Sequence, residues 1–216
     1  LSFFTFQAMS YAIEVHRKRQ EPEKHFGILA LYVMFYPQMV AGPIERPQNL
    51  LPQFRERHRF EFQNLSAGLK LMIWGLFKKV VIADRLAIYV DTVYNNQEYH
   101  NGATFIVATL LFSFQVYCDF SGYSDIAVGA ARVKGFHLIN NFRLPYLSKS
   151  ISEFWSKWHI SLSNWLRDYV YMPVLQSTNR KLKRRKLLGM RKEIWIYSTA
   201  TFITFMISGI WHGAAW

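Results

Sequence analysis

Long apolar runs alternate with short charged connections along the whole chain. Residues 26–44 and 194–216 contain no Asp, Glu, Lys or Arg, and the shorter run 102–118 is just as free of them. A helix needs about 20 apolar residues to cross a bilayer, so the two longer runs are predicted to span one. Residues 1–13 resemble the end of another span. Core helices of a soluble protein are the alternative, but several such runs in one short chain are rare outside membranes.

Two less apolar segments are also predicted to be helical. Residues 65–94 mix charged and apolar side chains, and residues 150–171 are rich in Trp. Each is typical of a tilted, re-entrant or interfacial helix. The expected fold class is therefore all-α integral membrane, a polytopic bundle of spanning, tilted and interfacial helices. Because both chain ends lie inside apolar runs, residues 1–216 are expected to be a single membrane domain truncated at both ends.

Composition agrees with a mixture of spans and charged connections. Hydrophobic residues make up 51% and aromatic residues 17% of the chain, yet mean hydropathy is only +0.00. The single cysteine, Cys118, excludes an internal disulfide framework and any zinc site built on several cysteines.

The net charge of +12 would suit nucleic acid, anionic lipid or a phosphorylated substrate. The charge pattern distinguishes among them. Residues 180–192 hold eight Lys or Arg and no acidic residue, between a Trp-rich helix and a predicted span. A short basic loop beside a span is expected on the cytoplasmic side. These neighbours do not resemble a nucleic-acid-binding module, so the predicted partner is the lipid bilayer and no nucleic acid.

The first polar group with candidate chemistry follows the apolar run 102–118. Asp119 and Asp125 would be costly at membrane depth, so they are expected to face a cavity or a partner. Together with Ser121 and Tyr123 they are candidates for lining a substrate path, and Gly122 permits a local break in the helix. A short loop at the membrane surface is the alternative. Too few ligands are visible for a metal site, so none is expected.

A proline-bearing stretch, residues 40–47, ends the run 26–44. Gly42-Pro43 ends or kinks a helix, and Pro47 follows closely. The simplest interpretation is the end of a span, with Arg46 among the lipid head groups.

On a continuous helix over residues 150–171, polar side chains would share one face. They are Ser152, Ser156, His159, Ser163 and Arg167. Either this is a membrane-surface helix with an aromatic belt, or its polar face lines a cavity. In the second case Ser163, Asn164 and Arg167 are further candidates for a substrate path.

His212 lies late in the last apolar run, between Gly209 and Gly213, which leave room for a helix or a ligand. An ionisable residue inside a span is a functional hypothesis by default. Burial would keep the imidazole neutral, as a general base requires. An interfacial histidine beside Trp211 is the alternative. The chain has no phosphate-binding glycine loop and no Gly-x-Ser-x-Gly motif.

Six stretches, in order along the chain, resemble the membrane-bound O-acyltransferase family. They are residues 2–7, 40–44, 118–125, 158–163, 165–169 and 211–213. The similarity is greatest to its bacterial alginate O-acetyltransferase branch, and the teichoic-acid D-alanyl transfer proteins are more distant. The resemblance implies a ring of tilted helices around a thin central region. It also implies that His212 is catalytic and that His159 is a second family position.

The function implied by the resemblance is transfer of an acyl group, acetyl above all, from a cytosolic thioester to hydroxyls of an exported polysaccharide. The thioester would be acetyl-CoA or an acyl carrier, used as co-substrate, with no bound cofactor. The acceptor would be the polysaccharide itself or a periplasmic or extracellular acyl-relay protein. The protein would be multi-pass in a bacterial inner membrane. A secondary transporter or channel, or a non-catalytic scaffold of a polysaccharide export complex, are the alternatives.

Overall fold

The computed structural model describes residues 3–39, 42–182, 186–187 and 190–213. These residues fold into two compact units. The N-terminal unit lies within residues 3–143, and the C-terminal unit lies within residues 144–213. Each unit is described by itself below.

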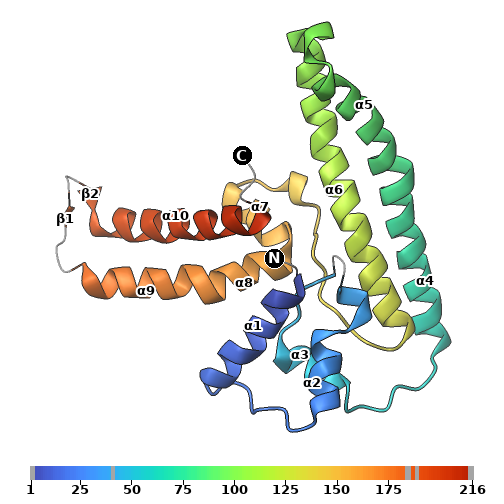
Figure 1. Cartoon of the computed structure of the whole chain (residues 1–216), viewed down its shortest axis with the longest axis vertical. Coiled ribbons are helices and arrows are strands. Elements are labelled where there is room, and N and C mark those ends of the chain that lie inside the picture. Colours follow the sequence, from blue (N-terminus) through green and yellow to red (C-terminus); the bar gives the residue numbers. More distant parts are fainter. Residues whose placement is uncertain (1–2, 40–41, 183–185, 188–189, 214–216) are drawn as a thin grey trace. The chain divides into compact units, whose positions relative to one another are not determined.

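The N-terminal unit is built from helices alone within its described residues. In chain order they are α1 (Phe3–His16), α2 (Phe26–Val33), η1 (Tyr36–Gln38), α3 (Pro47–Gln53), α4 (Phe62–Leu76), η2 (Phe77–Ala83), α5 (Asp84–Asn95), η3 (Gln97–Tyr99) and α6 (Gly102–Val133). The segment η2 is a π-helix that joins α4 to α5 without a break. The predicted helix over residues 65–94 is therefore confirmed, and Figure 1 shows α4 and α5 running alongside α6.

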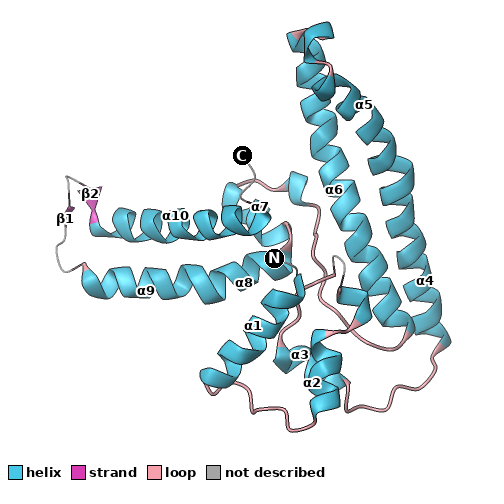
Figure 2. Cartoon of the chain, viewed as in Figure 1, coloured by secondary structure: helices cyan, strands magenta, loops and turns pink. Residues whose placement is uncertain are grey.

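The C-terminal unit contains η4 (Pro145–Leu147), α7 (Ile151–Lys157), α8 (Ile160–Leu166), η5 (Arg167–Tyr171), α9 (Met172–Lys181), β1 (Lys186–Leu187), β2 (Met190–Arg191) and α10 (Lys192–His212). A second π-helix, η5, joins α8 to α9. The segments η5 and α9 lie side by side with α10 (Figure 1). Apart from the short β1–β2 pair, the described elements of both units are helices (Figure 2). The predicted all-α membrane fold is therefore confirmed.

Among the described residues, two helices are long and apolar enough to cross a membrane, namely α6 and α10. They correspond to the predicted runs 102–118 and 194–216. The predicted span over residues 26–44 is wrong, because α2 ends at Val33 and only the three-residue η1 follows. Pro37 explains the break, since proline removes a backbone donor and disfavours helix at the preceding residue.

The proline-bearing stretch is more than the end of a helix. Val40 and Ala41 lie outside the described residues, but Glu45 is only 1% exposed. Its carboxylate accepts hydrogen bonds from Asn49 Nδ2 at 2.6 Å and from the Ile139 amide at 2.5 Å. Glu45 therefore joins the start of α3 to the connection after α6, and the placement of Arg46 among the lipid head groups stays a prediction.

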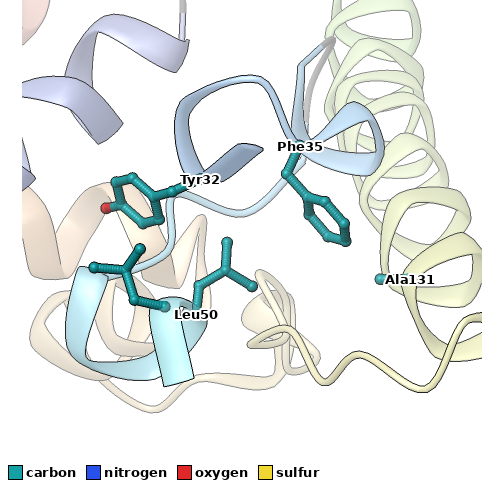
Figure 3. Close-up of a cluster of buried hydrophobic side chains, with 5 residues drawn as sticks. Tyr32, Phe35, Leu50 and Ala131 are labelled. Carbon is teal, nitrogen blue, oxygen red and sulfur yellow. The ribbon is translucent and has the colours of Figure 1, made fainter. Parts of the chain in front are cut away.

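A hydrophobic cluster forms the core of the N-terminal unit. Its buried members are Tyr32, Phe35, Leu50, Leu51 and Ala131, from α2, α3, the connection after α2, and α6 (Figure 3). The rings of Phe54 and Phe136 each lie within 5.3 Å of the Phe35 ring, centroid to centroid. This cluster holds the short helices against the C-terminal end of α6.

Two pairs of glycines allow α4 and α6 to approach closely. Gly68 faces Gly129, and Gly75 faces Gly122. A Cβ atom added at Gly122 would lie 2.7 Å from the Gly75 carbonyl oxygen, closer than real side chains come. The α6 helix continues through Gly122, so the predicted break there is wrong. The missing side chain serves backbone contact between two helices instead.

Candidate functional site

The C-terminal unit breaks its helix at His159. The preceding helix α7 begins after Ser150, whose hydroxyl accepts a hydrogen bond from the Glu153 amide at 3.1 Å. This is an N-cap of the usual kind. At the other end of α7, Trp158 is extended and His159 takes the left-handed conformation, with φ 43° and ψ 56°. A new helix, α8, then starts at Ile160.

Side-chain hydrogen bonds maintain this break. The Ser163 hydroxyl donates to the Trp158 carbonyl at 2.9 Å, taking the place of a helical N–H. Left-handed backbone is uncommon outside glycine, although histidine adopts it more often than most residues. Such strain persists only where surrounding contacts enforce it, and it concentrates at functional sites.

The prediction of one continuous polar face over residues 150–171 is wrong because of this break. Ser152 and Ser156 belong to α7, before the break, whereas His159 is only 4% exposed. Arg167 is exposed and lies in the π-helical η5, where its Nε pairs with Asp168 Oδ1 at 2.9 Å. The five side chains therefore do not share a face, and the helical spacing across His159 does not apply.

Aromatic rings surround the break. Phe154 and Trp158 stack with ring centroids 5.5 Å apart, and the Tyr146 ring lies 6.1 Å from the Trp158 ring. Trp155 meets Phe205 of α10 edge to face at 5.5 Å. This last contact fixes α7 against the C-terminal half of α10, the half that carries His212.

His212 is the last residue of α10, and Gly213 ends the helix with φ 136°. A φ of this size strains any residue with a side chain, so glycine is favoured there. The His212 ring lies 4.4 Å from the Trp211 ring, and open space surrounds Gly209. The predicted burial of His212 is wrong, because its side chain is exposed in this structure. The buried histidine of the pair is His159.

The electrostatic environment of His159 includes His212 of the same unit. Burial, with a further contribution from His212, lowers the pKa of His159 to about 3. His159 is therefore a neutral imidazole at physiological pH. A neutral, buried histidine and an exposed one at a helix end form a pair with distinct environments.

The remaining candidates lie in the N-terminal unit and meet lysines of the π-helix η2. Lys78 Nζ lies 2.6 Å from Asp125 Oδ2 and donates to the Ser121 hydroxyl at 2.9 Å. Lys79 Nζ lies 2.7 Å from Asp119 Oδ1. The two carboxylates of α6 thus have cationic partners, as the cost of an isolated charge inside a candidate span requires.

Lys79 has two further neighbours. Its Nζ lies 2.6 Å from Asp84 Oδ1 and 5.4 Å from the centre of the Tyr123 ring. Sequence reasoning missed both lysines as partners of this polar group. Two adjacent lysines inside the predicted helix 65–94 were the available signal, but pairing them with α6 requires the register of the two helices.

Within the described parts of the chain, no three His, Cys, Asp or Glu side chains converge where a metal ion could bind. The candidates therefore form two groups. One is the histidine pair of the C-terminal unit, with Ser163 and Asn164 nearby in α8. The other is the ion-pair cluster of α6 and η2.

The sequence matches the model of the membrane-bound O-acyltransferase family over residues 1–216. The chain belongs to this family. This agrees with the two candidate spans and with the order of the six stretches described above.

Three curated proteins that are similar to this chain are named as enzymes of acyl transfer. The chain is 38% identical, over 99% of its length, to the probable alginate O-acetylase AlgI of Pseudomonas putida, covering 41% of that protein. It is 34% identical over its full length to the peptidoglycan O-acetyltransferase of Helicobacter pylori, covering 44% of it. It is 29% identical over its full length to the teichoic acid D-alanyltransferase of Streptococcus thermophilus, covering 52%. The chain thus spans about half or less of the length of these relatives.

Proposed function

We propose that this protein is a membrane O-acyltransferase that transfers an acetyl group from a cytosolic thioester to hydroxyl groups of an exported polysaccharide, or of a relay protein that passes the group on. Family membership supports the reaction class. The names of the relatives, alginate O-acetylase and peptidoglycan O-acetyltransferase, support acetyl as the group and a surface glycan as its destination.

The observation that carries the proposal is the histidine pair of the C-terminal unit. His212 is at the carboxyl end of α10, where unpaired backbone carbonyls give the helix a partial negative charge. The His212 side chain is exposed there, which leaves its ring open to the hydroxyl of an acceptor. His159, buried and neutral, is suited to positioning rather than to carrying charge.

The reaction follows from these roles. A hydroxyl oxygen of the acceptor attacks the thioester carbonyl carbon, and His212 accepts the hydroxyl proton as the C–O bond forms. The tetrahedral intermediate then expels the thiolate, which takes the proton back from His212. An ester and a free thiol are the products, and no acyl-enzyme is needed. Holding both substrates in one narrow region supplies much of the rate enhancement.

The protein would work in a bacterial inner membrane as a multi-pass protein, with residues 180–192 on the cytoplasmic side. Basic residues at that face would attract an anionic donor such as acetyl-CoA or an acylated carrier protein.

The test is His212→Gln in the full-length protein, expressed in a strain that lacks the native gene. Glutamine keeps hydrogen-bonding capacity and adds no charge, so the protein should accumulate normally in the membrane. Transfer should fall by about 10²–10⁴, the usual contribution of a general base. Ester content of the surface glycan, measured by mass spectrometry, is the readout, with protein level checked by immunoblot.

His16→Gln is a matched control, because His16 is also an exposed histidine at the last position of a helix, α1. It should leave ester content unchanged. His159→Gln should reduce transfer less than His212→Gln. Full ester content in the His212→Gln strain would remove this histidine from the mechanism.

A further inference from the structure

Three segments of the N-terminal unit meet at one end of the α4–α6 pair. They are residues 17–25, 54–61 and 132–137. Arg55 and Glu23 form an ion pair of 2.7 Å between the first two. The His58 ring lies 4.2 Å from the Phe136 ring, centroid to centroid, which joins the second to the third. These contacts make one continuous surface, called the basic end below.

The basic end and the opposite end of the same helices differ strongly in charge. Residues 17–25, 54–61 and 132–137 contain nine Lys or Arg and four Asp or Glu. The opposite end is the connection from α5 to α6, and residues 86–101 contain no Lys or Arg at all. Sequence alone does not reveal which connections share an end, so this asymmetry depends on the fold.

Two arginines of the basic end are available to a partner. Arg57 and Arg59 are exposed, and neither has a carboxylate partner among the described residues. Close to them in the chain are Phe60 and Phe62, which are 78% and 73% exposed. Phe26, which begins α2 directly after segment 17–25, is 83% exposed.

Exposed rings beside exposed cations are typical of the membrane interface, where rings enter the acyl boundary and cations meet phosphates. The α6 helix, a candidate span, ends at this surface with Val133. A bilayer crossed by α6 would therefore have this surface on one of its two sides.

We propose that the basic end binds anionic phospholipids of the cytoplasmic leaflet, with Arg57 and Arg59 on the phosphates and Phe26, Phe60 and Phe62 at the acyl boundary. This anchor orients the N-terminal unit, leaving the α5–α6 connection on the far side of the membrane. It uses neither histidine of the C-terminal unit and goes beyond acyl transfer.

The experiment is a lipid titration of purified full-length protein by native mass spectrometry, with phosphatidylglycerol and phosphatidylcholine as the two probes. The wild type should prefer phosphatidylglycerol. R57Q/R59Q should bind it about fivefold more weakly for each arginine removed, since each cation near an anionic surface contributes about that much. Binding of phosphatidylcholine should change little.

R57K/R59K is the charge-matched control and should retain most of the preference. F60A/F62A should weaken the binding of both lipids, because the rings contact acyl chains whatever the head group. All variants are first checked for a monodisperse gel-filtration peak.

An unchanged preference for phosphatidylglycerol in R57Q/R59Q would overturn the proposal. An equal loss in R57K/R59K would overturn it too, because attraction to an anionic head group depends on charge. If R57Q/R59Q instead lost a co-purifying protein and kept its lipids, the surface would be a protein-docking site and the lipid proposal would be wrong. No acyl transfer is measured, so either result leaves the proposed enzymatic function untouched.

Discussion

The close approach of α4 and α6 gives a prediction that the geometry makes quantitative. Gly122→Ala would place a methyl group 2.7 Å from the Gly75 carbonyl oxygen and 3.2 Å from the Lys79 amide nitrogen. Both are backbone atoms, so no side chain can rotate away to relieve the contact. The helices must separate, which would also disturb the nearby Lys78–Ser121 and Lys79–Asp119 contacts.

Two opposing effects set the magnitude. Overpacking typically costs about 1–3 kcal/mol, while alanine in a helix interior stabilises it by roughly 0.5–1 kcal/mol relative to glycine. The difference is a net loss of roughly 0–2.5 kcal/mol of unfolding free energy, with a centre near 1 kcal/mol. Each kcal/mol corresponds to about 2–4 °C in melting temperature for 150–250 residues, and to less for a longer chain.

Thermal unfolding of the purified full-length protein in detergent, followed by loss of the monodisperse gel-filtration peak, measures the shift. Gly102→Ala is the matched control, because no atom lies within 4 Å of a Cβ added there. It should melt at or slightly above the wild-type temperature. If Gly122→Ala melted no lower than Gly102→Ala, the helices would not be packed through these glycines.

Two further predictions concern pH and topology. The pKa of His159 falls from about 6.5 in the unfolded chain to about 3 in the folded protein. As the pH is lowered, the unfolded chain therefore binds a proton at this histidine before the folded protein does. The contribution of this histidine to stability should be constant above about pH 6.5, and it should decline as the pH falls from there towards about 3. His159→Gln should flatten that part of the pH–melting-temperature profile, and an identical slope in the variant would assign the acid sensitivity to other groups. For the loop 180–192, a cysteine placed at Ser177 in a Cys118→Ala background should resist a membrane-impermeant maleimide on intact cells and react after lysis. Ready labelling on intact cells would place that loop outside.

The apolar runs predicted the fold class and the candidate span α10, because hydrophobic length is a direct physical requirement for crossing a bilayer. The run 102–118 is too short to span by itself and indicated only the apolar half of α6, which is 32 residues long. Each wrong prediction about the fold has its own physical cause. Residues 26–44 carry no charge, but Pro37 breaks the helix within them, and hydropathy does not register a lost backbone donor. Composition likewise does not predict that Glu45 is buried, since its partners Asn49 and the Ile139 amide come from separate elements.

The structure tests the geometry expected around the candidate residues, and their catalytic roles stay predictions. His159 and His212 stood out through the family stretches, yet burial was predicted for His212 and belongs to His159. Periodicity assumed an unbroken helix, whereas the left-handed backbone at His159 and the hydroxyl of Ser163 end one helix and begin another. A single strained residue cannot be recognised from spacing, because its conformation is imposed by tertiary contacts.

The length of α6 has a consequence for the membranes in which this protein can reside. A helix of 32 residues is about 48 Å long, against roughly 30 Å for the hydrocarbon layer and about 40–45 Å with the head groups. A bilayer-crossing α6 would therefore be longer than the oily layer even where the bilayer is several ångströms thicker than usual. A change of lipid thickness would then be met by a change of helix tilt.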